Sequence, residues 1–193
     1  MLQLPESKFI LKMLRRDLAP DLYYHTIEHT LDVYDRVVYI AENENIDEFD
    51  LKLLLIAALY HDCGYLTERD HHEVRSCAIV KDVLPRYGYS EKDIERICTL
   101  IMSTKLPQEP TSLLEQIICD ADLDYLGRAD FFDIGNRLFR EMLAVGRVDN
   151  EQEWDAIQID FLKKHRYFTA TANTMRSQKK QENLNVLLLK HRN

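Results

Sequence analysis

Residues 53–65 read LLLIAALYHDCGY, an unbroken apolar run that leads directly into a His-Asp pair. Leu51, Leu55 and Ala58 recur at helical spacing, and Asp62 continues the same stripe. A carboxylate that faces a protein core is costly unless it is paired or bound to a metal. The stretch therefore predicts a core helix that ends in residues of metal-ligand type.

The same helical periodicity recurs along the chain, for example at Ile94, Ile97, Cys98 and Ile101. The chain has only five glycines and five prolines, the residues that favour the tight turns of hairpins. No stretch shows the sustained alternation of apolar and polar residues that marks a strand. We therefore predict an all-α protein, a single-domain helical bundle over residues 1–193, because no linker or repeat interrupts the pattern. The predicted helices lie near residues 5–18, 28–44, 49–62, 71–84, 91–104, 112–126, 130–145, 151–166 and 170–190.

Start and stop signals flank several of these helices. Gly64, residues 85–88 and residues 107–110 supply the glycines and prolines expected where helices stop. At four starts a short polar residue is followed three positions later by an acidic one, as in a capping box. These pairs are Asp47 with Asp50, Ser90 with Asp93, Ser112 with Glu115 and Asn150 with Glu153.

Composition narrows the classes of protein and partner. A net charge of −8 argues against nucleic-acid binding, which needs a basic face, but one metal and a few cations can still neutralise a small phosphorylated ligand. No signal peptide is visible, and the longest apolar run is far shorter than a membrane span. Four scattered cysteines without a CxxC pair indicate reduced, mostly buried thiols. We expect a cytoplasmic protein.

Two further segments place metal-ligand residues on apolar helix faces. His29 shares a stripe with Val33 and Val37, and Asp122 follows Ile118 at a four-residue step. One inward histidine is more often a satisfied core residue than a ligand. Three independent segments that each carry a ligand type on a core stripe favour one shared metal site.

The order of these residues carries a family resemblance. His29, then His61-Asp62, then an aspartate near residue 122 resembles the H…HD…D signature of the all-helical HD-domain phosphohydrolase superfamily. The likeness extends from residue 23 to residue 130, with the C-terminal helices at 131–193 beyond it. The resemblance implies a metal held by His29, His61, Asp62 and Asp122. Asp120 is the second choice, because the family ligand usually stands between a small and an apolar residue. The motifs are YYHTIEHTLDVYDRV, LLLIAALYHDCGY, DHHEVRSCAIVKDVL and IICDADLDYLGRADFF.

The segment YHTIEHTLDV is also similar to the YHxxxH…DV segment of class I cyclic-nucleotide phosphodiesterases. That similarity implies that His25 protonates the leaving oxygen while His29 binds the metal. His25 precedes the predicted helix, so a capping or surface role remains open. The chain is shorter than such a catalytic domain, and no purine-reading glutamine can be located, so the substrate stays open.

The expected cofactor is one divalent metal ion rather than two. Two imidazoles and two carboxylates suit Mn, Fe, Zn or Ni better than Mg. Binuclear HD enzymes have a further histidine pair downstream, and the corresponding stretch LIMSTK has none. For His71 and His72 two roles are open: they reach a second metal, or they cap the helix that they begin. His72, Lys105 and Arg128 are candidate substrate contacts, and a plain exposed side chain is the alternative for Lys105 and Arg128.

The sequence therefore predicts a metal-dependent phosphohydrolase that cleaves a phosphate ester of a nucleotide or related small molecule. A cyclic-nucleotide diester and a 5′-nucleotide are both open as substrates. Asp62 is expected to orient a metal-bound hydroxide for attack, and His25 to act as the general acid. The alternatives are a non-catalytic ligand-binding or regulatory HD module and a metal-dependent oxygenase, which would need additional histidine ligands.

Overall fold

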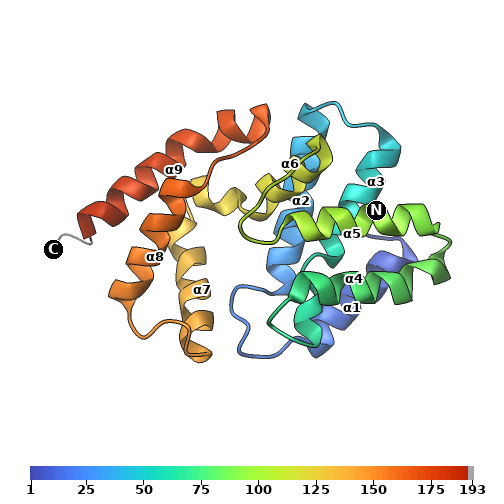
Figure 1. The fold of residues 1–193 in the computed structure, drawn as a ribbon, viewed down its shortest axis with the longest axis horizontal. Coiled ribbons are helices and arrows are strands. Elements are labelled where there is room, and N and C mark those ends of the chain that lie inside the picture. The colour runs from blue at the N-terminus through green and yellow to red at the C-terminus, as the bar shows by residue number, and fades with distance from the viewer. Residues whose placement is uncertain (191–193) are drawn as a thin grey trace.

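The computed structural model describes residues 1–190 and shows an all-α protein, as predicted (Figure 1). No strand occurs among these residues, and residues 191–193 of the predicted C-terminal region lie outside them. The α-helices are α1 Pro5–Asp17, α2 Ile27–Asn43, α3 Glu48–Tyr60, α4 His72–Val83, α5 Glu91–Ser103, α6 Leu113–Asp122, α7 Phe131–Ala144, α8 Glu151–Lys164 and α9 Ala170–Lys190. Short 3₁₀ helices follow α3, α4 and α6, at η1 Cys63–Leu66, η2 Leu84–Tyr87 and η3 Asp124–Gly127.

The predicted start signals are used as caps. Ser90 and Asp93 form a complete capping box at α5. The side chains of Asp47, Ser112 and Asn150 each accept a hydrogen bond from the backbone N–H three residues later. Each satisfied N–H removes one of the unpaired donors that every helix start carries.

Two of the helices that end earlier than predicted, α3 and α6, end next to candidate site residues. The helix predicted over 49–62 ends at Tyr60, because the Ser76 hydroxyl takes the carbonyl of His61 at 2.6 Å. The helix predicted over 112–126 ends at Asp122. There the backbone tightens into η3, in which the N–H of Leu126 bonds the carbonyl of Leu123 at 3.2 Å, and the Tyr167 hydroxyl lies 3.4 Å from the carbonyls of Leu123 and Asp124.

Helix α3 is the centre of the main core. Every residue from Leu53 to Tyr60 is buried, so α3 is apolar on all sides and is covered by α1, α2, α5 and α6. Fully burying one such side chain contributes about 1.5–3 kcal/mol. The central position of α3 brings the residues that follow it, His61 and Asp62, into the interior.

The C-terminal helices α7, α8 and α9, which lie beside the α1–α6 half in Figure 1, attach through a second apolar cluster. The cluster includes Leu126, Phe131, Leu162 and Leu187 from η3, α7, α8 and α9. Helix α9 packs directly against η3, since a Cβ on Gly127 would lie 2.4 Å from the carbonyl oxygen of Arg176. The chain therefore has a main helical core and a flanking group of helices, with the site residues between them.

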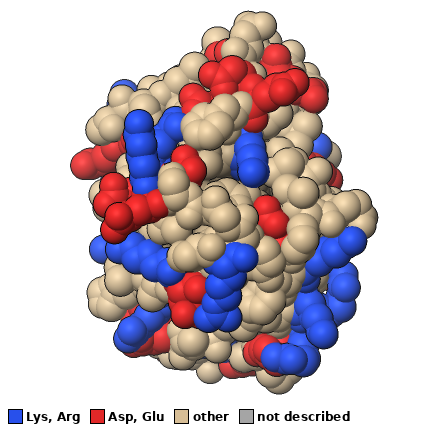
Figure 2. All heavy atoms as spheres, turned by 90° about the vertical axis from the view of Figure 1, so that its right-hand side faces the viewer, with Lys and Arg blue, Asp and Glu red and all other residues tan. Residues whose placement is uncertain are grey.

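The surface carries charges of both signs, and the cysteines lie inside the protein. On the face shown in Figure 2, acidic and basic side chains are interspersed and no basic patch spans the face. None of the helices in residues 1–190 combines the length and apolar character needed to cross a membrane. Cys63, Cys77, Cys98 and Cys119 are all buried and unpaired.

Candidate metal centre

The structure brings together the four side chains that the sequence assigned to a metal. His29 lies in the first turn of α2, His61 and Asp62 follow α3, and Asp122 is the last residue of α6. The Nε2 atoms of the two histidines are 3.3 Å apart. Asp62 Oδ2 lies 3.4 Å and 3.2 Å from Nε2 of His29 and His61, and Asp122 Oδ1 lies 3.3 Å and 3.6 Å from them. Ligand atoms of His29, His61 and Asp122 thus all lie within 4.8 Å of one another, and Asp62 Oδ2 adjoins both histidines.

The imidazole of His61 is oriented by its backbone surroundings. Its Nδ1 lies 2.8 Å from the carbonyl of Ala58, which requires Nδ1 to carry the proton. In the neutral ring, the form that binds a metal, its Nε2 is then the lone-pair donor that points into the cluster. A second hydrogen bond of this kind is what commonly fixes the tautomer of a metal-binding histidine.

The charges of the cluster support one another even without a cation. Burial opposes ionisation of His61 and of Asp62, yet their close contact outweighs burial. The pKa of His61 is therefore raised and the pKa of Asp62 is held well below its usual value. Burial likewise opposes the ionisation of Asp122, but His29 and His61 lower its pKa to about 2. The carboxylates are thus charged, as metal ligands must be.

One oxygen of the cluster has surroundings that suit a cation ligand. Asp62 Oδ2 is fully buried and forms no hydrogen bond, although two imidazole nitrogens lie nearby. An unsatisfied buried carboxylate oxygen is costly. Two imidazole nitrogens and two carboxylate oxygens form a donor set suited to a borderline divalent ion.

The three aspartates of the stretch CDADLD have different surroundings. Asp122 faces the histidines. Asp124 is paired with Arg176, with Oδ1 at 2.7 Å from Nε. Asp120 points the other way and accepts hydrogen bonds from the backbone N–H groups of Phe168 and Thr169 and from the Thr169 hydroxyl. Burial raises the pKa of Asp120 to about 6. The sequence alternative, Asp120 as the last ligand, is therefore not the one that the structure places beside His29 and His61.

We expect Asp120→Asn to lower the free energy of unfolding by about 1–3 kcal/mol, because an amide nitrogen would face buried backbone donors that now have an acceptor. Urea unfolding followed by circular dichroism measures this change. The exposed Asp160→Asn on α8 is the matched control and should remain within about 0.5 kcal/mol of wild type. Equal stability of the two variants would contradict the role assigned to Asp120.

His25 stands just before α2, which begins at Ile27, so it does not share a helical face with His29. Its Nδ1 is 2.5 Å from Oε1 of Glu141 on α7, and its Nε2 is 3.1 Å from the Tyr65 hydroxyl. Glu141 is 3% exposed and its other oxygen accepts from the backbone N–H groups of Tyr24 and His25. Burial raises the pKa of Glu141, but these hydrogen bonds outweigh burial and lower it. Sequence reasoning missed Glu141 and Tyr65.

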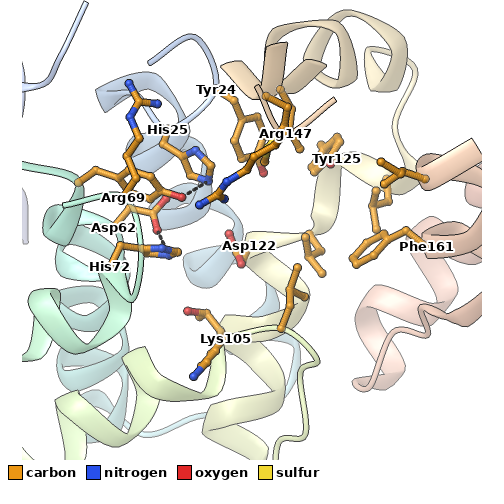
Figure 3. Close-up of a pocket in the computed structure, with 18 of the residues that line it drawn as sticks. Tyr24, His25, Asp62, Arg69, His72, Lys105, Asp122, Tyr125, Arg147 and Phe161 are labelled. Carbon is orange, nitrogen blue, oxygen red and sulfur yellow. Dashed lines mark hydrogen bonds and ion pairs between the residues drawn. The ribbon is translucent and has the colours of Figure 1, made fainter. Parts of the chain in front are cut away.

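The candidate substrate contacts are divided between two cavities. His72 and Lys105 line a cavity of about 400 Å³ that also reaches His25, Asp62 and Asp122. His72 Nε2 lies 3.3 Å from Asp62 Oδ1, and Lys105 is exposed. Figure 3 shows His25, Asp62 and His72 on one side of this cavity and Phe161 on the other.

Arg128 lies in a neighbouring cavity of about 240 Å³ instead. Its guanidinium is paired with Asp32 at 2.6 Å and with Asp130 at 2.5 Å. Both carboxylates already occupy the donors that a phosphate would use. Two arginines that the sequence analysis did not single out, Arg69 and Arg147, line the large cavity. Arg147 comes from the turn after α7, and no local pattern marks it.

Comparisons with known proteins agree with this arrangement. The HD domain family model matches residues 26–124, more than half of the chain. A stretch of 79 residues is 33% identical to an uncharacterized protein of Clostridium beijerinckii, covering 38% of this chain and 48% of that protein. The match thus spans about half the length of this curated relative.

Two solved structures have a similar fold. A predicted HD superfamily hydrolase from an uncultured Thermotogales bacterium has a TM-score of 0.64 at 24% identity, over 98% of this chain and 95% of its own. Bacillus subtilis YpgQ in complex with ADP has a TM-score of 0.65 at 22% identity, over 95% and 94%. At these identities the structures support the fold alone. Because the family model spans more than half of the sequence and includes all four clustered side chains, the chain belongs to the HD domain family.

Proposed function

We propose that the protein hydrolyses a phosphate ester of a nucleotide or a related small molecule, with one divalent metal held by His29, His61, Asp62 and Asp122. Family membership implies a metal-dependent phosphohydrolase in general terms. The observation that carries the proposal for this chain is the cluster of His29, His61 and Asp122 ligand atoms beside the buried Asp62 Oδ2, which has no hydrogen-bond partner. Mn, Fe, Zn and Ni suit this donor set better than Mg.

A bound ion of this kind lowers the pKa of water and polarises phosphorus. The chain's own residues would orient the attacking water and bind the phosphate. Asp62 has a second oxygen, Oδ1, on the side of His72, where it is placed to orient a water. Lys105 and His72 place positive or proton-donating groups around the cavity, where they can hold phosphate oxygens, whereas Arg69 and Arg147 are already paired with Asp21 and Asp70. Arg128 stays a weaker candidate, since its guanidinium is already paired with two carboxylates.

His25 is assigned the role of proton donor to the leaving oxygen. It lines the same cavity as Asp62 and Asp122; Glu141 fixes the ring through Nδ1, and Nε2, which lies 3.1 Å from the Tyr65 hydroxyl, is the nitrogen that would give its proton to the leaving oxygen in place of that contact. A histidine suits this role because its usual pKa lies near neutrality. A fixed ring keeps the proton directed at one position, which is where an effective general acid gains its advantage.

A nucleotide substrate is supported by two observations of different kinds. The segment around His25 and His29 is similar to that of cyclic-nucleotide phosphodiesterases, and YpgQ, whose fold is similar, was solved in complex with ADP. Cyclic diesters and 5′-monoesters differ in the oxygen that leaves, and both remain substrates to test.

The proposal is tested by a screen of manganese-loaded protein against 5′-nucleotides, cyclic nucleotides and an aryl phosphodiester. Release of a nucleoside or nucleotide product supports it. Binding of nucleotides without turnover would instead indicate a non-catalytic HD module. No turnover and no binding of any of these compounds would refute the proposal.

We expect Glu141→Gln to lower kcat by about 10–100-fold while KM and metal content stay near wild type, by analogy with groups that orient ligands in metal sites. The amide has one acceptor oxygen in place of two, so either the backbone N–H groups of Tyr24 and His25 or Nδ1 of His25 would face an N–H₂ group and the imidazole would lose its hold. Steady-state kinetics with the best substrate of the screen measures the effect. Glu95→Gln, at an exposed position of α5, is the control. A loss of metal, or a kcat equal to that of the control, would show that Glu141 does not act through His25.

A further inference from the structure

Two of the four cysteines lie against each other, and neither of them lines the large cavity. Cys77 belongs to α4 and Cys98 to α5, and these two helices pack against each other. The Sγ atom of Cys77 lies 3.5 Å from the carbonyl oxygen of Cys98, and the Sγ atom of Cys98 lies 3.8 Å from the carbonyl oxygen of Cys77. Because each side chain reaches the backbone of the other residue, the two thiols meet at the contact between the helices.

These two thiols are also the ones that solvent reaches. Cys77 and Cys98 are each 8% exposed, whereas Cys63 and Cys119 are 0% exposed. Cys119 donates instead to the carbonyl of Ser103, with its Sγ atom at 3.1 Å from that oxygen. A small oxidant dissolved in water can therefore meet the Cys77 and Cys98 sulfurs, while protein atoms shield the other two.

The surroundings of Cys98 favour its thiolate. The Cys77 thiol donates a hydrogen bond to it, which lowers the pKa of Cys98, and the nearby ammonium group of Lys81 acts in the same direction against the effect of burial. The same hydrogen bond raises the pKa of the Cys77 thiol, and burial raises the pKa of Cys63 and of Cys119. The thiolate is the form of cysteine that reacts with oxidants. The pair thus combines one activated sulfur with a protonated partner beside it.

We propose that Cys77 and Cys98 are a redox-sensitive pair, which a peroxide oxidises to a disulfide bond between α4 and α5. Hydrogen peroxide first reacts with the Cys98 sulfur: an S–O bond forms, the O–O bond breaks, and the hydroxide that leaves takes up a proton. The Cys77 sulfur then attacks this sulfenic acid, so that an S–S bond forms, the S–O bond breaks and water leaves. In total the two thiols lose two electrons and two protons, and one peroxide molecule becomes two water molecules.

The disulfide would act close to the metal centre without involving a ligand. Ser76 is the residue before Cys77 in α4. Its hydroxyl donates to the carbonyl of His61 at 2.6 Å and accepts from the N–H of Gly64 at 2.8 Å. A bond at Cys77 would therefore tie the part of α4 that holds this turn to α5. It would also close a loop from residue 77 to residue 98, which restricts the unfolded chain more than the folded one.

The experiment treats reduced wild-type protein with hydrogen peroxide, then counts free thiols by alkylation in denaturant and mass spectrometry. We expect the loss of two of the four thiols, a linked pair of peptides that contain Cys77 and Cys98, and full recovery of the thiols with dithiothreitol. The oxidised protein should unfold about 5–10 °C above the reduced protein, as expected for a disulfide that closes a loop of this length.

Two variants separate this pair from the other cysteines. Cys77→Ser should show neither the linked peptides nor the rise in Tm. Cys119→Ser is the matched control, because it keeps the pair and a hydrogen-bond donor to Ser103, and it should respond to peroxide as wild type does. The peptide map of wild type needs no variant, so the inference stays testable even if Cys77→Ser folds poorly.

Four alkylated thiols after peroxide treatment, or a loss of thiols without a link between Cys77 and Cys98, would overturn the inference. An unchanged Tm in protein that carries the link would show that the disulfide does not lock α4 to α5. The measurements need neither metal nor substrate, so their outcome is independent of the proposed phosphohydrolase activity.

Discussion

His61→Ala and Asp62→Ala should each remove the bound metal and lower kcat/KM by at least about 10³-fold, because both side chains are ligands in the proposed site and the metal supplies the main activation of water and phosphorus. His61 contributes an imidazole nitrogen whose proton is fixed on the opposite side by the carbonyl of Ala58. Asp62 contributes the buried oxygen that has no hydrogen-bond partner. Neither contribution has a substitute among the neighbouring side chains that the structure describes.

The measurement is the metal content of purified protein by elemental analysis, together with hydrolysis of the best substrate of the screen. Asp35→Ala, at an exposed position of α2, is the matched control and should keep both metal and activity. Asp120→Asn should also keep its metal despite its lower stability, since Asp120 points at the backbone of Phe168 and Thr169. Equal metal content in wild type, His61→Ala and Asp62→Ala would contradict the assignment of His61 and Asp62 as metal ligands.

The second large effect is expected at His25. His25→Asn should lower kcat for a nucleotide by about 10²–10⁴-fold, the usual contribution of a general acid, while the metal content stays that of wild type. The loss arises because the leaving oxygen of a nucleoside is strongly basic and departs poorly without a proton. His25 lies beside the cluster without belonging to it. Its Nδ1 is 2.5 Å from Oε1 of Glu141, and its Nε2 is 3.1 Å from the Tyr65 hydroxyl.

The leaving group distinguishes a proton donor from a residue that merely shapes the cavity. An aryl phosphodiester releases a phenolate that needs little protonation, so His25→Asn should retain most of its activity on that compound. We measure kcat for both substrates in wild type and variant, with thermal unfolding as a check that the variant folds. A loss of the same size on both substrates would remove the general-acid role and leave His25 a structural residue.

Much of the fold of this protein follows from short stretches of its sequence. Helical periodicity and caps such as Ser90 with Asp93 marked the helices closely, because the burial stripe and the start signals of a helix lie within a few residues of each other. The order of His29, His61-Asp62 and Asp122 indicated a shared site for the same reason. Each ligand type continues or adjoins an apolar stripe, and the stripes of a bundle face one interior.

Other features depended on residues far apart in the sequence. Glu141 lies 116 positions after His25, so no local pattern connects them. Beyond the end of α6, Tyr167 contacts the carbonyl of Leu123, and Asp120 is held away from the histidines by the backbone N–H groups of Phe168 and Thr169. The side of the large cavity on which Phe161 lies likewise required α7 and α8 to be positioned opposite the HD residues.

By itself, the sequence determined the all-helical class, the boundaries of most helices and the residue types able to meet at a metal, since these follow from hydrophobic spacing and short-range hydrogen bonds. Only the tertiary structure decided which aspartate faces the histidines, which acid holds His25 and which two thiols lie together. Those choices depend on contacts between segments separated by many residues, which chain periodicity does not encode.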